Sequence, residues 1–151
     1  MKRAQRLEMV RQSVHELERR RAQTLAASEQ RVAESNGRLA ELESYQHTYA
    51  TQFTARAGQG IGAAGLRDFQ TFLARLAEAV KQQGQIVTRA KVERDAHLKS
   101  WQTAAQRAEA VGRIVKRWQA EAQRQIDRRE QSESDERSQQ KISRGPHIRG
   151  G

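Results

Sequence analysis

The chain has 151 residues, of which 36% are hydrophobic and 30% charged, and it contains no cysteine. Globular domains carry about 45–50% apolar residues, so this chain is expected to bury a stripe along helices rather than a compact core. The missing cysteines exclude disulfides and thiolate metal sites and fit a reducing compartment, with the cytosol as the simplest assignment. No apolar run is long enough to cross a membrane, and the N-terminus carries no apolar signal core.

The net charge is +10, from 28 Lys and Arg against 18 Asp and Glu. Such a charge favours anionic partners, which could be nucleic acid, a membrane surface or an acidic protein. The basic excess gathers at the two ends of the chain.

The first part of the chain is predicted to form a helix over about residues 3–55, because its apolar residues recur at heptad spacing. Its core positions fall into two frames displaced by four residues, with the displacement near Glu18–Arg21, and such an insertion locally unwinds a supercoil. The first frame is Leu7, Val10, Val14 and Leu17, and the second is Leu25, Val32, Leu39, Leu42, Tyr49 and Phe53.

A bend is predicted over about residues 56–64, where glycines gather in a chain with few other breakers. The glycines are Gly58, Gly60, Gly62 and Gly65. The cluster lacks the Gly-Lys-Ser/Thr ending of a phosphate loop and follows a helix rather than a strand. Its expected role is therefore a hairpin bend that uses positive φ.

A second helix is predicted over about residues 65–141. Eight unbroken heptads run from Leu66 to Ala122, which is the signature of a left-handed coiled coil. Polar residues interrupt this seam at Gln83, Arg94 and His97, where they can fix the register or leave room for a partner. We expect a coiled-coil domain over residues 1–142 and a flexible tail over 143–151.

A bend of this length brings the second helix back antiparallel to the first, so the predicted fold is an all-α antiparallel coiled-coil hairpin. In the register that places Phe53 opposite about Leu66, Leu7 lies opposite about Gly112. The second helix would then overhang, with little or no partner from the same chain for residues 115–141.

We expect no enzyme, no cofactor and no metal, because two paired helices offer no interior in which catalytic groups could converge. The histidines agree, since none of them stands in a helical ligand pattern. They are His15, His47, His97 and His147.

Basic clusters at Arg19–Arg21 and Lys116–Arg117 raise the question of nucleic-acid binding. Acidic residues alternate with them, and antiparallel helices lack the dense one-sided basic run that grips a duplex. Solvated faces with local ion pairs are the simplest interpretation, and an acidic protein surface is the main alternative.

Both tryptophans occupy heptad core positions. Trp101 is expected in the core, opposite about Glu18. Trp118 lies where the first helix should have ended, beside Lys116 and Arg117, so it is either a core residue or the anchor of a protein interface.

A second stripe lies beside the seam, near the bend. It consists of Phe72, Leu76, Ala79 and Gln83. Two interpretations remain open, a wide apolar face covered by Tyr45 and Tyr49, or a docking strip for another protein.

Several segments occur in an order and spacing that point to a known family. They are Leu39–Gln46, Tyr49, Gly58–Ile61, Phe69–Leu73, Leu76, Leu98–Trp101 and Asp135–Glu136. With these segments the chain resembles the FliJ family, coiled-coil proteins of the bacterial flagellar type III export apparatus. The resemblance is close over about residues 39–103.

The resemblance implies a non-enzymatic export factor, similar to the stalk subunit of rotary ATPases, that supports flagellum assembly and motility. Its partners would be the hexameric export ATPase, export chaperones and the cytoplasmic region of the export-gate membrane protein. It would be cytoplasmic and peripheral on the cytoplasmic side of the inner membrane. The gate-docking strip of the family falls on Phe72, Leu76, Ala79 and Gln83, with Gln83 where a histidine is often expected.

The resemblance also places the open end of the hairpin, Leu7–Leu25 with Val111–Ile126, inside the ATPase ring. The expected contacts are Arg113, Lys116, Arg117 and Trp118. The alternative is a basic coiled-coil module that binds nucleic acid or an anionic membrane surface, and steeply salt-dependent binding would favour it.

Overall fold

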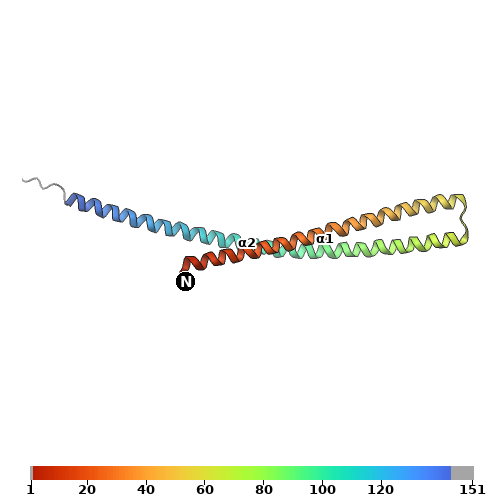
Figure 1. Cartoon of the computed structure of the whole chain (residues 1–151), viewed down its shortest axis with the longest axis horizontal. Coiled ribbons are helices and arrows are strands. Elements are labelled where there is room, and N and C mark those ends of the chain that lie inside the picture. The colour runs from red at the N-terminus through yellow and green to blue at the C-terminus, as the bar shows by residue number, and fades with distance from the viewer. Residues whose placement is uncertain (1, 144–151) are drawn as a thin grey trace, which may run out of the picture. The chain divides into compact units, whose positions relative to one another are not determined.

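The computed structural model describes residues 2–143 and consists of two α-helices joined by a short bend (Figure 1). Helix α1 spans Arg3–Gln59 and helix α2 spans Ala63–Ser143. The described residues form no strand, and the two helices make an all-α hairpin, so the predicted fold class is confirmed. The expected flexible tail lies, from residue 144 on, outside the described residues.

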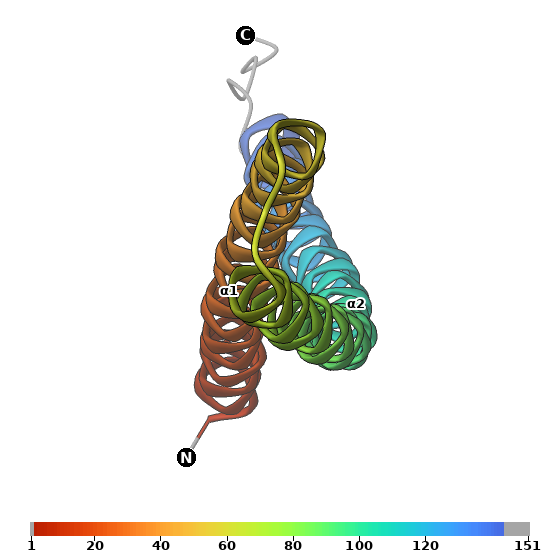
Figure 2. The ribbon, with the colours of Figure 1, turned by 90° about the vertical axis from the view of Figure 1, so that its right-hand side faces the viewer.

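The bend is shorter than expected, because only residues 60–62 leave the helices (Figure 2). Gly60 has a φ of +88°, a conformation that favours glycine. The carbonyl of Gly62 accepts a hydrogen bond from the Leu66 amide at 2.9 Å, which begins the first turn of α2. A Cβ on Gly65 would lie 3.0 Å from Cγ1 of Ile61, so a glycine there lets the side chain of Ile61 pack against α2. Gly58 has ordinary helical geometry, and α1 therefore continues to Gln59 instead of ending near residue 55.

The chain divides into two compact units. The bend unit is residues 16–105. The terminal unit is residues 1–15 together with 106–151, of which 2–15 and 106–143 are described.

The core of the bend unit is a thin stripe with few fully buried side chains. These are Ser28, Val32, Leu76, Gln83, Val87 and Ala104. The other large apolar seam residues are half-buried, as a two-helix contact allows. The bend unit therefore buries a stripe of side chains, as the low hydrophobic content predicted.

Small polar residues occupy part of the α1 seam. Ser28 is 1% exposed, and its hydroxyl donates to the Leu25 carbonyl at 2.7 Å. The hydroxyl of Ser35 donates in the same way to the Val32 carbonyl at 3.0 Å. Both serines satisfy their own hydrogen bonds, so they can lie at core positions that the hydrophobic pattern did not mark.

Aromatic rings hold the two helices together near the bend. The rings of Phe53 and Phe69 lie 5.6 Å apart, and those of Tyr49 and Phe72 lie 4.6 Å apart. The ring partner of Phe53 is thus one turn beyond Leu66, the residue that the sequence placed opposite it.

The terminal unit buries less. Val115 is 6% exposed, and Leu7 and Val14 of α1 are half-buried. Val10, expected in the seam, is 48% exposed and lies off it. Every residue from Gln119 to Ser143 is exposed.

The overhang therefore begins later than predicted. Val115 is buried, and Trp118 lies under the side chain of Arg3, so the expectation that residues from 115 onward lack a partner is wrong for these two. For Trp118 the physical reason is the length of the Arg3 side chain, because this first residue of α1 extends along α2 about half a turn beyond the expected register.

Ion pairs lie along single helices in the portion of the chain from residue 2 to residue 143. They join Glu8 to Arg11, Arg94 to Asp95, Glu109 to Arg113, and Glu133 to Arg137. Exposed pairs of this kind contribute little to stability, so apolar packing holds α1 against α2. No helix among the described residues carries an apolar stretch long enough to cross a membrane.

Candidate protein-interaction surfaces

The predicted docking strip lies on α2 of the bend unit, and only half of it is accessible. Phe72 is 43% exposed and Ala79 is half-buried. Leu76 and Gln83 are 9% and 7% exposed, because residues seven apart return to the same seam of the coiled coil. A partner could therefore contact Phe72 and Ala79 directly, and the use of this strip as a docking surface stays a prediction.

The two tyrosines that might have covered the strip behave differently. Tyr49 packs its ring on Phe72 at a tilt of 57°, which is a favourable aromatic geometry. Tyr45 is 58% exposed. Phe72 and Tyr45 thus leave aromatic surface open to solvent near the bend, while Tyr49 fixes the orientation of the Phe72 ring.

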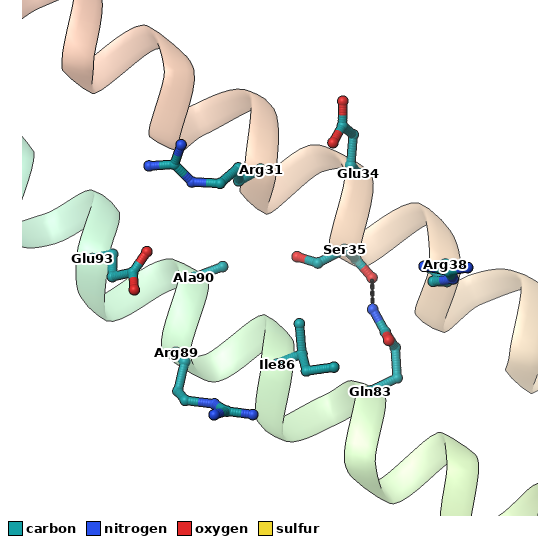
Figure 3. Close-up of a pocket in the computed structure, with 9 residues that line it drawn as sticks. All are labelled: Arg31, Glu34, Ser35, Arg38, Gln83, Ile86, Arg89, Ala90 and Glu93. Atoms are coloured by element: carbon teal, nitrogen blue, oxygen red, sulfur yellow. Dashed lines mark hydrogen bonds between the residues drawn. The ribbon is translucent and has the colours of Figure 1, made fainter.

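Gln83 turns inward, and its amide spans the seam. Its Nε2 donates to the backbone carbonyl of Ser35 at 3.0 Å (Figure 3). Over residues 2–143, this is the one side-chain hydrogen bond that joins α1 to α2. A buried polar group at a seam position fixes register at some cost in stability. The sequence marked Gln83 both as a seam interruption and as a docking residue, and the geometry matches the first role.

A shallow groove of about 440 Å³ runs beside Gln83 in the bend unit (Figure 3). Arg31 and Arg38 of α1 and Arg89 of α2 line it, and Ile86, 43% exposed, lies between the two helices. Sequence analysis missed this groove because its basic residues are spread over both helices and form no local cluster.

Three of the four expected ATPase contacts form a basic face on α2 of the terminal unit. Arg113, Lys116 and Arg117 are exposed and share that face, because residues three and four apart are neighbours on a helix. Arg113 donates to Glu109 at 2.8 Å, and both side chains are 67% exposed, so this pair is weak and open to exchange.

Trp118, the fourth expected contact, lies beside that face and is half-buried. The guanidinium carbon of Arg3 lies 3.4 Å from the centroid of its ring, which is a close cation–π contact. Arg3 and Trp118 border a notch of about 440 Å³, which is completed by Glu121, Ala122 and Gln125. The sequence left Trp118 either in the core or at an interface, and the structure places it between these alternatives.

Trp101 is half-buried in the bend unit, in line with its predicted core position. Its indole Nε1 is buried without a hydrogen-bond partner. The ring therefore contributes apolar contact and no polar one at this point of the seam.

The described residues include no group of three His, Asp or Glu side chains that could hold a metal ion. Glu8 and Arg11 form an ion pair on α1. Arg11 donates to Glu8 at 3.0 Å, and this hydrogen bond lowers the pKa of Glu8 and raises the pKa of Arg11. Both groups face solvent, so the pair reflects local helix electrostatics rather than a catalytic site.

One comparison with known proteins gives a match. The family model described as Flagellar FliJ protein matches residues 1–147, which is nearly the whole chain. No curated protein and no solved structure matches the chain.

Proposed function

The chain belongs to the FliJ family and is a component of the flagellar export apparatus, and from this premise we propose that it is a non-enzymatic export factor with a stalk-like role. The observation that carries the proposal is the extent of the family match, because residues 1–147 include both helices and the unpaired part of α2. The factor works in the cytoplasm and joins the cytoplasmic side of the inner membrane through its partners. It supports flagellum assembly and motility.

The first partner is the hexameric export ATPase, which receives the terminal unit. Support comes from the exposed basic face of Arg113, Lys116 and Arg117 beside the half-covered ring of Trp118. A tryptophan next to basic residues has the composition of an interface anchor. The charges speed encounter and orient the complex more than they set its affinity.

The second partner is the cytoplasmic region of the export-gate membrane protein, which docks on the bend unit. Phe72 and Ala79 supply the contact surface, and Leu76 supports them from the seam. Gln83 acts indirectly, through its bond to Ser35 and the register that this bond fixes. Export chaperones are the third class of partner.

The ATPase assignment is tested by binding of the purified chain to the export ATPase. Lys116→Glu with Arg117→Glu should weaken binding by about tenfold or more, and Trp118→Ala should weaken it at unchanged charge. The matched control is Lys81→Glu with Lys91→Glu, which makes the same charge change at exposed positions of the bend unit. Unchanged binding in the first variants, or equal loss in the control, contradicts the assignment of this end. Salt-dependent binding to duplex DNA or acidic vesicles without ATPase binding would support the basic-module alternative.

The gate assignment is tested with Phe72→Ala. This variant should lose binding to the gate protein and lose swimming, while circular dichroism shows a folded hairpin, because Phe72 is partly exposed. Val92→Ala is the matched control, since Val92 is a 63% exposed apolar residue of α2 outside the strip. Normal swimming and gate binding in Phe72→Ala would rule the strip out.

A further inference from the structure

The notch beside Trp118 combines an aromatic ring with polar side chains. One wall is the indole ring, and the guanidinium of Arg3 already stacks on it at 3.4 Å. The other walls include a carboxylate from Glu121 and an amide from Gln125. An aromatic face combined with a carboxylate is the chemistry that recognises a guanidinium.

Arg3 leaves part of this chemistry unused. No hydrogen bond or ion pair of the described residues joins Arg3 to Glu121 or to Gln125, although all three line the notch. A guanidinium has five N–H donors that can meet a carboxylate while its plane stacks on a ring. A second arginine arriving from solvent could stack on the ring and bond to the carboxylate, whereas Arg3 makes only the ring contact.

The contact between Arg3 and the ring of Trp118 is also weak. It is the first residue of α1, and the first turn of that helix contains no acidic residue. Lys2 lies just before the helix and Arg6 lies in its first turn, and both basic side chains oppose the helix dipole. A cation–π contact at an exposed site favours the covered state by only roughly two- to fivefold, so the ring is uncovered for an appreciable share of the time.

We propose that the notch of Trp118, Glu121 and Gln125 is a binding site for an arginine side chain, which Arg3 fills in the free chain and an arginine of a partner protein fills when the terminal unit is engaged. The partner step rests on the proposed function. The site itself rests only on the geometry of this chain.

The covering step is tested in a Trp101→Phe background, where Trp118 is the sole tryptophan. Trp101 makes no hydrogen bond through Nε1, so phenylalanine removes none there. Arg3→Ala should raise acrylamide quenching of Trp118 by about two- to threefold, because the ring loses its cover. Arg6→Ala removes the same charge from the same turn and should leave quenching unchanged. Equal quenching in the parent and Arg3→Ala overturns the proposal.

The binding step uses the indole N–H signal of Trp118 in ¹⁵N-labelled chain, again with Trp101→Phe. In the Arg3→Ala variant, N-acetyl-arginine amide should shift this signal saturably, and the uncharged N-acetyl-citrulline amide should not. With Arg3 present, the apparent affinity should fall by roughly three- to sixfold through competition. Glu121→Gln should weaken the arginine response. Equal shifts with both compounds, no shift with either, or no competition by Arg3 overturns the proposal.

The partner step is tested by binding of the Arg3→Ala variant to the export ATPase. Affinity should be retained or raised, because the site is vacated before the partner arrives. A loss of affinity would make Arg3 itself the contact and overturn the replacement step. Failure of every variant, parent included, to bind the ATPase would count against the proposed function, since the two spectroscopic tests use the chain alone.

Discussion

Replacing Gln83 separates its structural role from a direct docking role. The side chain is 7% exposed, and its Nε2 donates to the Ser35 carbonyl at 3.0 Å. In Gln83→Ala this hydrogen bond is lost, while the Ser35 carbonyl lies inside α1 and keeps its helical partner. In Gln83→Leu the seam keeps a side chain of similar size but without polar groups.

The expected changes in the free energy of unfolding follow from what each variant removes from the seam. The alanine variant loses a hydrogen bond of about 0.5–1.5 kcal/mol and a buried methylene of about 0.8 kcal/mol, so its free energy of unfolding should fall by about 1.3–2.3 kcal/mol. That corresponds to a melting temperature lower by about 3–9 °C. The leucine variant should be as stable as the parent or more stable by up to about 2 kcal/mol, because a buried polar pair often stabilises less than apolar packing of the same shape.

The assay is thermal and urea unfolding followed by circular dichroism at 222 nm. Gln82→Ala is the control, because Gln82 is exposed and its bond at 3.4 Å goes to Glu78 on the same helix. It should stay within about 0.5 kcal/mol of the parent. An unchanged Gln83→Ala variant, or a Gln83→Leu variant destabilised as much as the alanine one, would refute the argument that Gln83 pins the seam.

Three further predictions test the bend, the N-terminal turn and the unpaired part of α2. Gly60→Ala should lower the melting temperature, because a residue with a Cβ at φ +88° costs about 1–2 kcal/mol, whereas Gly58→Ala in open helical space should raise it slightly. The pKa of Glu8 is lowered by Arg11, so their contribution is present above the unfolded pKa of Glu8 and is lost as pH falls through the folded one. The protection factors of amides in the first helical turns, which correct for the intrinsic pH dependence of exchange, should then fall in acid, and Glu8→Gln should remove that fall. Deletion from residue 119 onward should reduce helical ellipticity but leave the melting temperature within a few degrees, since residues 119–143 are all exposed.

The hairpin could be predicted because its signals are local and periodic. Heptad spacing in α2 marked Leu76 and Val87, which the structure buries, and the glycine cluster marked the bend. Such patterns depend on the geometry of one helix at a time, so they survive without knowledge of the partner helix.

Heptad spacing could not predict which of the candidate site residues are accessible to a partner. A resemblance transfers positions along the chain, but whether Gln83 faces a partner or Ser35 depends on the rotation of α2 against α1. The cover on Trp118 depends on the reach of Arg3, a long flexible side chain that no apolar periodicity records. Val10 has the spacing of a core residue and lies outside the seam, because the pattern in this segment shifts frame within a few turns.

In the described part of the terminal unit, burial of α2 ends at Trp118. From Gln119 to Ser143, α2 exposes every side chain, and the interactions that hold it are local bonds such as Gln123 to Asp127 at 3.0 Å. Pairs of this kind contribute about 0.2–0.5 kcal/mol each, and an isolated helix in water is only marginally stable. Ile126 is 48% exposed, and the one fully buried side chain in the described part of this unit is Val115. In the proposed complex, a protein that encloses this segment would supply apolar contact to Ile126, and the same binding would bring it beside the ring of Trp118, which Arg3 covers in the free chain.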